Sequence, residues 1–266
     1  SLSLRGGEIE LAGSIKRQSA PVDLTTALDA RTRGILSGDI SLQTQANVDL
    51  QGGWVNDVLA PFNKLDDSPV AIEGGRFSAL ANGDIVLAKG SRVNVSGGAW
   101  AQAEGNIFDG TGGEISLFAQ GENTGSNLIL NGMLSAFALR HGGTLNLEVN
   151  GIAVVRRRQE EEDIEAVHPL QLDNDFLNSG GFSEFHLTSN INGVVVEEGA
   201  SLQLRQRNWQ LQSDVASHGN ADGIESLSTL VTQPVTQRLP ILFTLESVHS
   251  INPNPESGLV VQRNAA

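Results

Sequence analysis

A short motif recurs along this chain: one or two glycines, a polar residue, and then a run in which apolar and polar residues alternate. The copies are GGEIEL (6–11), SGDISL (37–42), GGRFSAL (74–80), NGDIVL (82–87), GGEISL (112–117), GGTLNL (142–147) and GGFSEFHL (180–187), and several are followed by a partner run such as ANVDLQGG (46–53), GSRVNVSGG (90–98), GSNLILNG (125–132) or GASLQL (199–204). Gly83, Gly113 and Gly143 are spaced 30 residues apart, which indicates a period. This repeat constrains the fold because each unit can only be a short strand bounded by turns.

The alternation gives each strand one buried and one exposed face. In GGEISL, Ile115 and Leu117 would point inward, whereas Glu114 and Ser116 would point outward. Glycine is expected to supply corners with positive φ between the strands. A coil of about 20–30 residues cannot bury its apolar face alone, so successive coils must stack about 4.8 Å apart. The sequence therefore predicts an all-β protein, a parallel β-helix, in which residues 82–98 form two faces of one coil.

Composition agrees with small, layered packing. Aromatic residues make up 5% of the chain, Tyr and Cys are absent and Met occurs once, so the core must consist of Val, Ile, Leu and Ala. An antiparallel β-sandwich is the structural alternative, because glycine-rich turns and alternating strands also suit it. The turns mostly lack the Asn-Gly or Asp-Gly loops of tight hairpins. This lack and the regular glycine spacing favour the β-helix.

Three segments interrupt the repeat. We expect residues 1–266 to form a single β-helix segment, with lateral excursions near 54–73 and 156–178 and an irregular connection near 205–238. Pairs of opposite charge four residues apart, Arg156 with Glu160 and Arg158 with Glu162, predict a short exposed helix ending before Pro169. The apolar run at 239–245 is expected to return to a strand, and SGLVVQ (257–262) to begin another coil.

Charge and cysteine content exclude several classes of function. A net charge of −14 argues against nucleic-acid binding, which needs clustered Lys and Arg. The absence of Cys excludes disulfides, zinc–thiolate sites and cysteine nucleophiles. No run approaches the roughly 18 apolar residues of a membrane span, and no signal peptide opens the chain. Because the sequence starts without Met inside SLSLRGGEIEL, we expect a fragment of a longer polypeptide whose targeting signals lie outside it.

Several stretches resemble one protein family. GGEIEL (6–11), ANGDIVLAKGSRVNVSGG (81–98) and GTGGEISL (110–117) resemble the passenger region of filamentous haemagglutinin-like exoproteins of bacterial two-partner secretion. The stretch from SGGAWAQ through GGFSEFHLTSNINGVVVEEGASLQL to RLPILFTLES is similar to the repeat-rich region of that family's long outer-membrane-associated members. The resemblance covers most of the chain. Its glycine and aliphatic patterns specify a fold better than a molecular function.

The resemblance implies a right-handed β-helix fibre exported through an outer-membrane two-partner secretion transporter, which a region outside this chain would engage. It also implies a secreted or cell-surface protein used in adhesion, biofilm formation or delivery of a distal toxin. The partner would be a receptor or glycan on a host cell or in a biofilm. We therefore expect a structural and adhesive shaft segment of a larger exoprotein. It would be no enzyme, bind no cofactor and bind no nucleic acid.

A polysaccharide-acting enzyme is the alternative, because parallel β-helices include pectate lyases and polygalacturonases. A polygalacturonase-like site needs aspartates and a histidine on adjacent coils, with carboxylates about 6.5–9.5 Å apart. His218 and the pair Asp66-Asp67 offer these residue types, but they are far apart in the chain and fall in predicted loops. A lyase needs calcium ligands. The outward acids are expected instead to alternate with Ser, Asn and Thr on a soluble face, without metal: Glu8, Glu10, Asp39, Asp84 and Glu114.

Trp54, Trp100 and Trp209 are the candidate ligand or receptor contacts, because indole rings stack on sugars and anchor interfaces. A carbohydrate-binding module built on them is a third hypothesis. Trp54 and Trp100 each follow a glycine pair, which suggests a shared position in the repeat and therefore a shared packing role. No catalytic or metal-binding residue is expected, and the five histidines lack the spacing of metal ligands.

Overall fold

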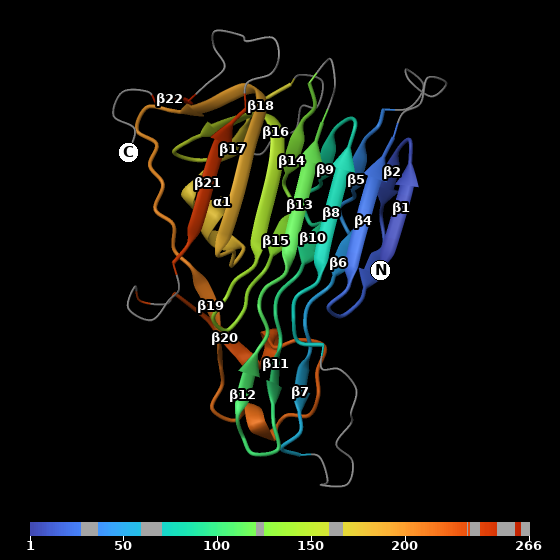
Figure 1. Cartoon of the computed structure of the whole chain (residues 1–266), viewed down its shortest axis with the longest axis vertical. Coiled ribbons are helices and arrows are strands. Elements are labelled where there is room, and N and C mark those ends of the chain that lie inside the picture. Colours follow the sequence, from blue (N-terminus) through green and yellow to red (C-terminus); the bar gives the residue numbers. More distant parts are fainter. Residues whose placement is uncertain are drawn as a thin grey trace.

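The computed structural model describes residues 1–27, 37–59, 71–120, 125–159, 167–232, 234, 240–248 and 259–261. Most of its strands belong to three parallel sheets (Figure 1). Sheet A contains β1 (Leu2–Gly6), β4 (Pro21–Thr26), β8 (Arg76–Ala81), β13 (Glu114–Ala119), β16 (Thr144–Val154), β18 (Glu184–Val196) and β21 (Leu242–Ser247), with β17 (Leu170–Leu172) beside β16 and β22 (Leu259–Val261) beside β18. Sheet B contains β2 (Ile9–Leu11), β5 (Ile40–Leu42), β9 (Ile85–Leu87) and β14 (Leu128–Leu130). Sheet C contains β3 (Ser14–Lys16), β6 (Asn47–Asp49), β10 (Arg92–Asn94) and β15 (Met133–Ser135).

The chain visits the three sheets in turn, and each visit to A, B and C is called a circuit below. The order is β1, β2, β3, then β4, β5, β6, then β8, β9, β10, then β13, β14, β15. In each sheet, a strand pairs in parallel with the strand of the next circuit. The prediction of an all-β protein built on parallel strands is confirmed. The sandwich alternative is wrong, because its strands would pair as antiparallel hairpins.

Inward side chains form continuous columns. In sheet A, Phe77 pairs with Ile115, Ile115 with Leu145, and Leu145 with Phe185. All four are at most 1% exposed and belong to one core that extends through every circuit. Alternation therefore places each apolar residue directly over its counterpart, as the sequence predicts for Ile115 and Leu117.

The glycine pairs before β8, β13 and β16 have a different role from the predicted one. Their φ angles are not positive; instead, successive backbones approach so closely that no side chain fits. A positive φ, as predicted, occurs at Gly38, Gly90, Gly125 and Gly181. A Cβ on Gly113 would lie 1.8 Å from the carbonyl oxygen of Gly75, and one on Gly143 would lie 2.1 Å from that of Gly113. Gly83 precedes β9 of sheet B, whereas Gly113 and Gly143 precede strands of sheet A. The interval of 30 residues is therefore not a structural period, and circuit length varies.

Two of the predicted interruptions contain regular structure. Residues 54–73 begin with β7 (Trp54–Asn56), which pairs with β11 (Ala99–Ala101), and β11 pairs with β12 (Ile107–Asp109). The connection near 205–238 contains β19 (Arg207–Leu211) and β20 (Ser228–Thr232), an antiparallel pair, with the 3-10 turns η1 (Val215–Ser217) and η2 (Glu225–Leu227) between them. Figure 1 shows these five strands as an extension at one end of the sheets. The extension has a small core of its own around Trp54.

The helix predicted in the third interruption falls mostly on residues 160–166, which lie outside the described residues, and 156–159 are not helical. A helix that the sequence did not predict, α1 (Asn174–Ser179), follows Pro169. Further on, β21 overlaps the run at 239–245 that the sequence predicts to return to a strand, and β22 lies within 257–262. β22 pairs in parallel with the end of β18.

Candidate functional site

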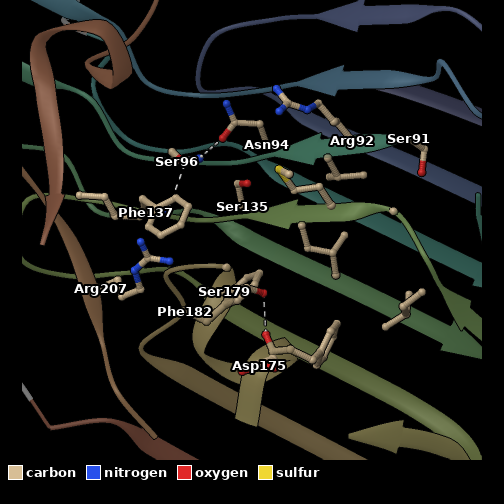
Figure 2. A pocket seen from close by; sticks show the side chains of 18 of the residues that line it. Ser91, Arg92, Asn94, Ser96, Ser135, Phe137, Asp175, Ser179, Phe182 and Arg207 are labelled. Carbon is tan, nitrogen blue, oxygen red and sulfur yellow. Dashed lines mark hydrogen bonds between the residues drawn. The ribbon is translucent and has the colours of Figure 1, made fainter. Parts of the chain in front are cut away.

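A groove of about 860 Å³ lies over the outward face of sheet C. Its floor comes from β6, β10 and β15, and α1 closes one end. One wall is formed by β19, β20 and η2 of the extension, and the other by residues 157–159. Figure 2 shows Arg92 and Asn94 on one side of this sheet C groove and Arg207, Phe137 and Phe182 on the other.

Hydrogen bonds between circuits hold the floor in place. Asn94 donates from Nδ2 to Oδ1 of Asp49 at 3.3 Å and accepts at Oδ1 from the backbone N–H of Ser96 at 3.1 Å. The Ser96 hydroxyl oxygen in turn accepts from the backbone N–H of Phe137 at 3.1 Å. Gln51 donates from Nε2 to the second oxygen of Asp49 at 3.2 Å. These polar side chains have fixed orientations and present a preorganised surface to the groove.

The end of the groove at α1 is organised by Asp173. Its side chain caps α1 by accepting from the Phe176 N–H at 2.8 Å, and its other oxygen accepts from the Arg158 N–H at 2.8 Å. The Arg158 guanidinium donates to the Leu130 carbonyl and lies 4.8 Å from the centroid of the Phe176 ring. Arg158 is therefore a structural residue of this part of the groove.

Aromatic rings form the wall at the extension. Trp209 of β19 lies beside Phe137, with ring centroids 5.2 Å apart and planes inclined by 55°. The backbone N–H of Trp209 donates to the Ala138 carbonyl at 2.9 Å, which joins β19 to the segment that follows β15. Phe137 is 8% exposed and Trp209 is half-buried. The wall thus offers a partly accessible indole beside a polar floor.

The charged groups of the groove differ in their partners. Asp49 and Asp173 are occupied by the hydrogen bonds above. Arg92 is exposed and Arg207 is half-buried, and neither has an ion-pair partner within the described parts of the chain. Sequence reasoning missed both arginines. Alternation places Arg92 on the outward face of its strand, but no sequence signal brings Arg207 to the same groove.

The structure separates the three tryptophans. Trp54 is completely buried in the extension core, and its Nε1 donates to the His218 carbonyl at 3.3 Å. Trp54 pairs with Ala99 rather than with Trp100. This offset of one residue places the two indoles on opposite faces of the extension, so the predicted equivalence is wrong. Trp100 is half-buried, and its Nε1 donates to Oδ2 of Asp57 at 2.7 Å.

Of the candidate catalytic residues His218, Asp66 and Asp67, the structure describes His218. The exposed imidazole of His218 lies 3.7 Å from the carboxylate of Asp214, and the His218 carbonyl is used by the side chains of Trp54 and Asn56. Asp66 and Asp67 lie outside the described residues. The acid predicted on sheet A, Glu114, accepts from Ser116 and Asn146, both at 2.8 Å.

Two further acids belong to a hydrogen-bonded column before sheet B. Asp39 accepts from the Asp84 N–H at 2.7 Å, and Asp84 accepts from the Asn127 N–H at 2.6 Å. The Asn127 side chain then accepts from the His168 N–H at 2.9 Å. Burial raises the pKa of the Asp84 carboxyl, the Asn127 N–H lowers it, and the negative charge of Asp39 raises it further. The column joins successive circuits through one carboxylate oxygen of each acid.

No family model, no curated protein and no solved structure matches this chain. The described residues contain no group of three or more His, Asp or Glu side chains arranged to hold a metal ion. No helix within the described parts has the length and apolar character that a membrane crossing requires. The stacked sheets and the sheet C groove are therefore the features that bear on function.

Proposed function

We propose that this chain is a shaft segment of a large bacterial filamentous adhesin, secreted or attached to the cell surface. In this proposal, sheets A, B and C are the three faces of a right-handed parallel β-helix. Right-handed connections between parallel strands of one sheet are strongly preferred, which supports that hand. The single observation that carries the proposal is the unbroken stack of sheet A from β1 to β21 over one continuous core.

Such a stack suits a mechanical role. In sheets A, B and C each strand pairs with strands of the neighbouring circuits, so stiffness comes from backbone ladders and aliphatic columns that continue from one circuit to the next. The acidic surface, at a net charge of −14, favours a fibre that remains soluble after export. The resemblance of the glycine-marked strands to filamentous haemagglutinin-like passenger regions supports export by two-partner secretion. The transporter would recognise a region outside this chain, and the shaft would hold adhesive parts away from the cell.

The experiment is single-molecule force spectroscopy with the chain held between two handles at its ends. A shaft of stacked circuits is expected to unfold in several small steps, as terminal circuits detach one after another, and to refold when the force falls. One all-or-none event for the whole chain would contradict the proposal.

A glycan-turnover assay tests the main alternative. The purified chain is incubated with acidic and neutral polysaccharides, and new chain ends are measured. We expect no turnover. Turnover that disappears in a folded His218→Ala variant would replace the shaft proposal with a polysaccharide-acting enzyme.

A further inference from the structure

We propose that the sheet C groove binds an anionic oligosaccharide whose carboxylates pair with Arg92 and Arg207. The proposal goes beyond the shaft function and does not depend on it. A volume of about 860 Å³ is within the usual range of ligand sites, about 300–1,000 Å³, and accommodates several sugar units.

The charge of the ligand follows from the two arginines. Within the described residues, Lys16, Arg76 and Arg140 each pair with an aspartate, whereas Arg92 and Arg207 lie in the groove without an ion-pair partner there. The acids of the floor and of the α1 end are already occupied by hydrogen bonds. Two exposed acids, Asp175 and Glu225, also line the groove. A guanidinium can bind a carboxylate in a bidentate manner, which provides orientation as well as affinity.

The rest of the groove favours a sugar over a peptide. A peptide that binds to a sheet usually pairs with a free strand edge. β6 and β10 are each paired on both edges, so these two strands of the floor offer side chains and no free backbone, whereas β15 is the edge strand of sheet C. Those side chains are amides and hydroxyls, including Asn94, Ser96 and Ser135, which match a ligand rich in hydroxyl groups.

An aromatic ring points to the same ligand class. The half-buried indole of Trp209 offers a surface on which a sugar ring can stack beside Phe137. Circuits repeat about every 4.8 Å, close to the length of one pyranose unit. A sugar chain laid across sheet C would therefore meet one outward column of polar side chains, Asp49, Asn94 and Ser135, on successive circuits.

The test measures binding to the whole chain by isothermal titration calorimetry. The probes are a short oligogalacturonate, the same oligosaccharide with its carboxylates methyl-esterified, a sulfated oligosaccharide of similar length and a poly-glutamate peptide. We expect the oligogalacturonate to bind, binding to weaken as salt rises, and the methyl ester to bind at least roughly tenfold more weakly. Arg92→Ala and Arg207→Ala should each weaken binding by roughly tenfold. Trp209→Phe should weaken it less.

Arg5→Ala is the matched control, because Arg5 is exposed on β1, outside the groove, and its loss changes the net charge equally. Circular dichroism of each variant keeps folding separate from binding. Unchanged affinity in folded Arg92→Ala and Arg207→Ala variants would overturn the proposal. So would absence of oligogalacturonate binding, tighter binding of the methyl ester, or tighter binding of the sulfated probe or of poly-glutamate.

Discussion

Replacing Gly113 with alanine tests whether successive circuits are in contact, backbone against backbone. The new methyl carbon would lie 1.8 Å from the carbonyl oxygen of Gly75, whereas non-bonded atoms pack at about 3.5 Å. The obstacle is backbone held in a sheet, so it cannot rotate away as a side chain would. The two circuits must therefore separate locally.

The hydrogen bonds at this position set the size of the effect. The Glu114 N–H donates to the Gly75 carbonyl at 3.1 Å, and the Thr144 N–H donates to the Gly113 carbonyl at 2.9 Å. Separation breaks the first bond and distorts the second. An unpaired buried backbone group costs about 1–3 kcal/mol, so we expect a destabilisation of about 2–4 kcal/mol for these partly buried groups.

Urea unfolding followed by circular dichroism measures this change. Gly219→Ala is the control, because Gly219 has a φ that is not positive and a Cβ there would meet no atom within 4 Å. That variant should be neutral or slightly more stable, by up to about 1 kcal/mol. If Gly113→Ala unfolded at the same urea concentration as Gly219→Ala, the close approach of the circuits would be refuted.

Three further substitutions test the column before sheet B, the extension core and the α1 end of the groove. In Asp84→Asn, the amide oxygen can still accept from the Asn127 N–H, but the charge is lost. Because the folded pKa of Asp84 is raised above 3.8, its ionised form destabilises the folded state. Asp84→Asn should therefore be more stable than the wild type near pH 7. The difference should shrink as pH falls below the raised pKa and vanish below the unfolded value of 3.8; melting curves across pH would contradict this if the difference grew in acid. Trp54→Ala should cost about 3–5 kcal/mol in urea unfolding, because the ring is completely buried, whereas Trp100→Ala should cost less, because that ring is half-buried; equal losses would contradict the assigned register. Asp173→Ala removes a helix cap and a partner of the Arg158 N–H, and should cost about 1–2 kcal/mol by thermal melting; an unchanged melting temperature would contradict the capping role.

The strands were predictable from sequence because alternation is a local signal. Ile115 and Leu117 face the core as the pattern requires, and the glycine-marked runs form β8, β9, β13 and β16. The interval of 30 residues failed for a reason that is not local. Two glycine motifs can look alike while one begins a strand of sheet A and the other a strand of sheet B, and only pairing between circuits distinguishes them.

The candidate site was harder to predict because it depends on register and on distant contacts. GGW and GGAW look equivalent, yet a difference of one position moves Trp54 into a core and Trp100 to the opposite face. Trp209 and Arg207 lie in a stretch where apolar and polar residues alternate only weakly. The sequence therefore predicts an irregular connection there and not the strand β19. Their place in the groove results from contacts with residues far away in the chain, such as Ala138.

The extension and the groove have a common origin in the connections from sheet C to sheet A. Extra residues after β6 and after β10 do not interrupt any ladder of sheets A, B or C, so these connections can lengthen without disturbing the core. The connection after β6 and the connection after β10 belong to consecutive circuits. They therefore lie side by side and pair with each other through β7 and β11. The segment around β19 and β20 then covers them, with Ala221 pairing to Trp54. Sheet C adjoins these connections, so the layer of β19 and β20 forms a wall beside the outward face of sheet C. The stacked fold thereby acquires a groove while its core stays continuous.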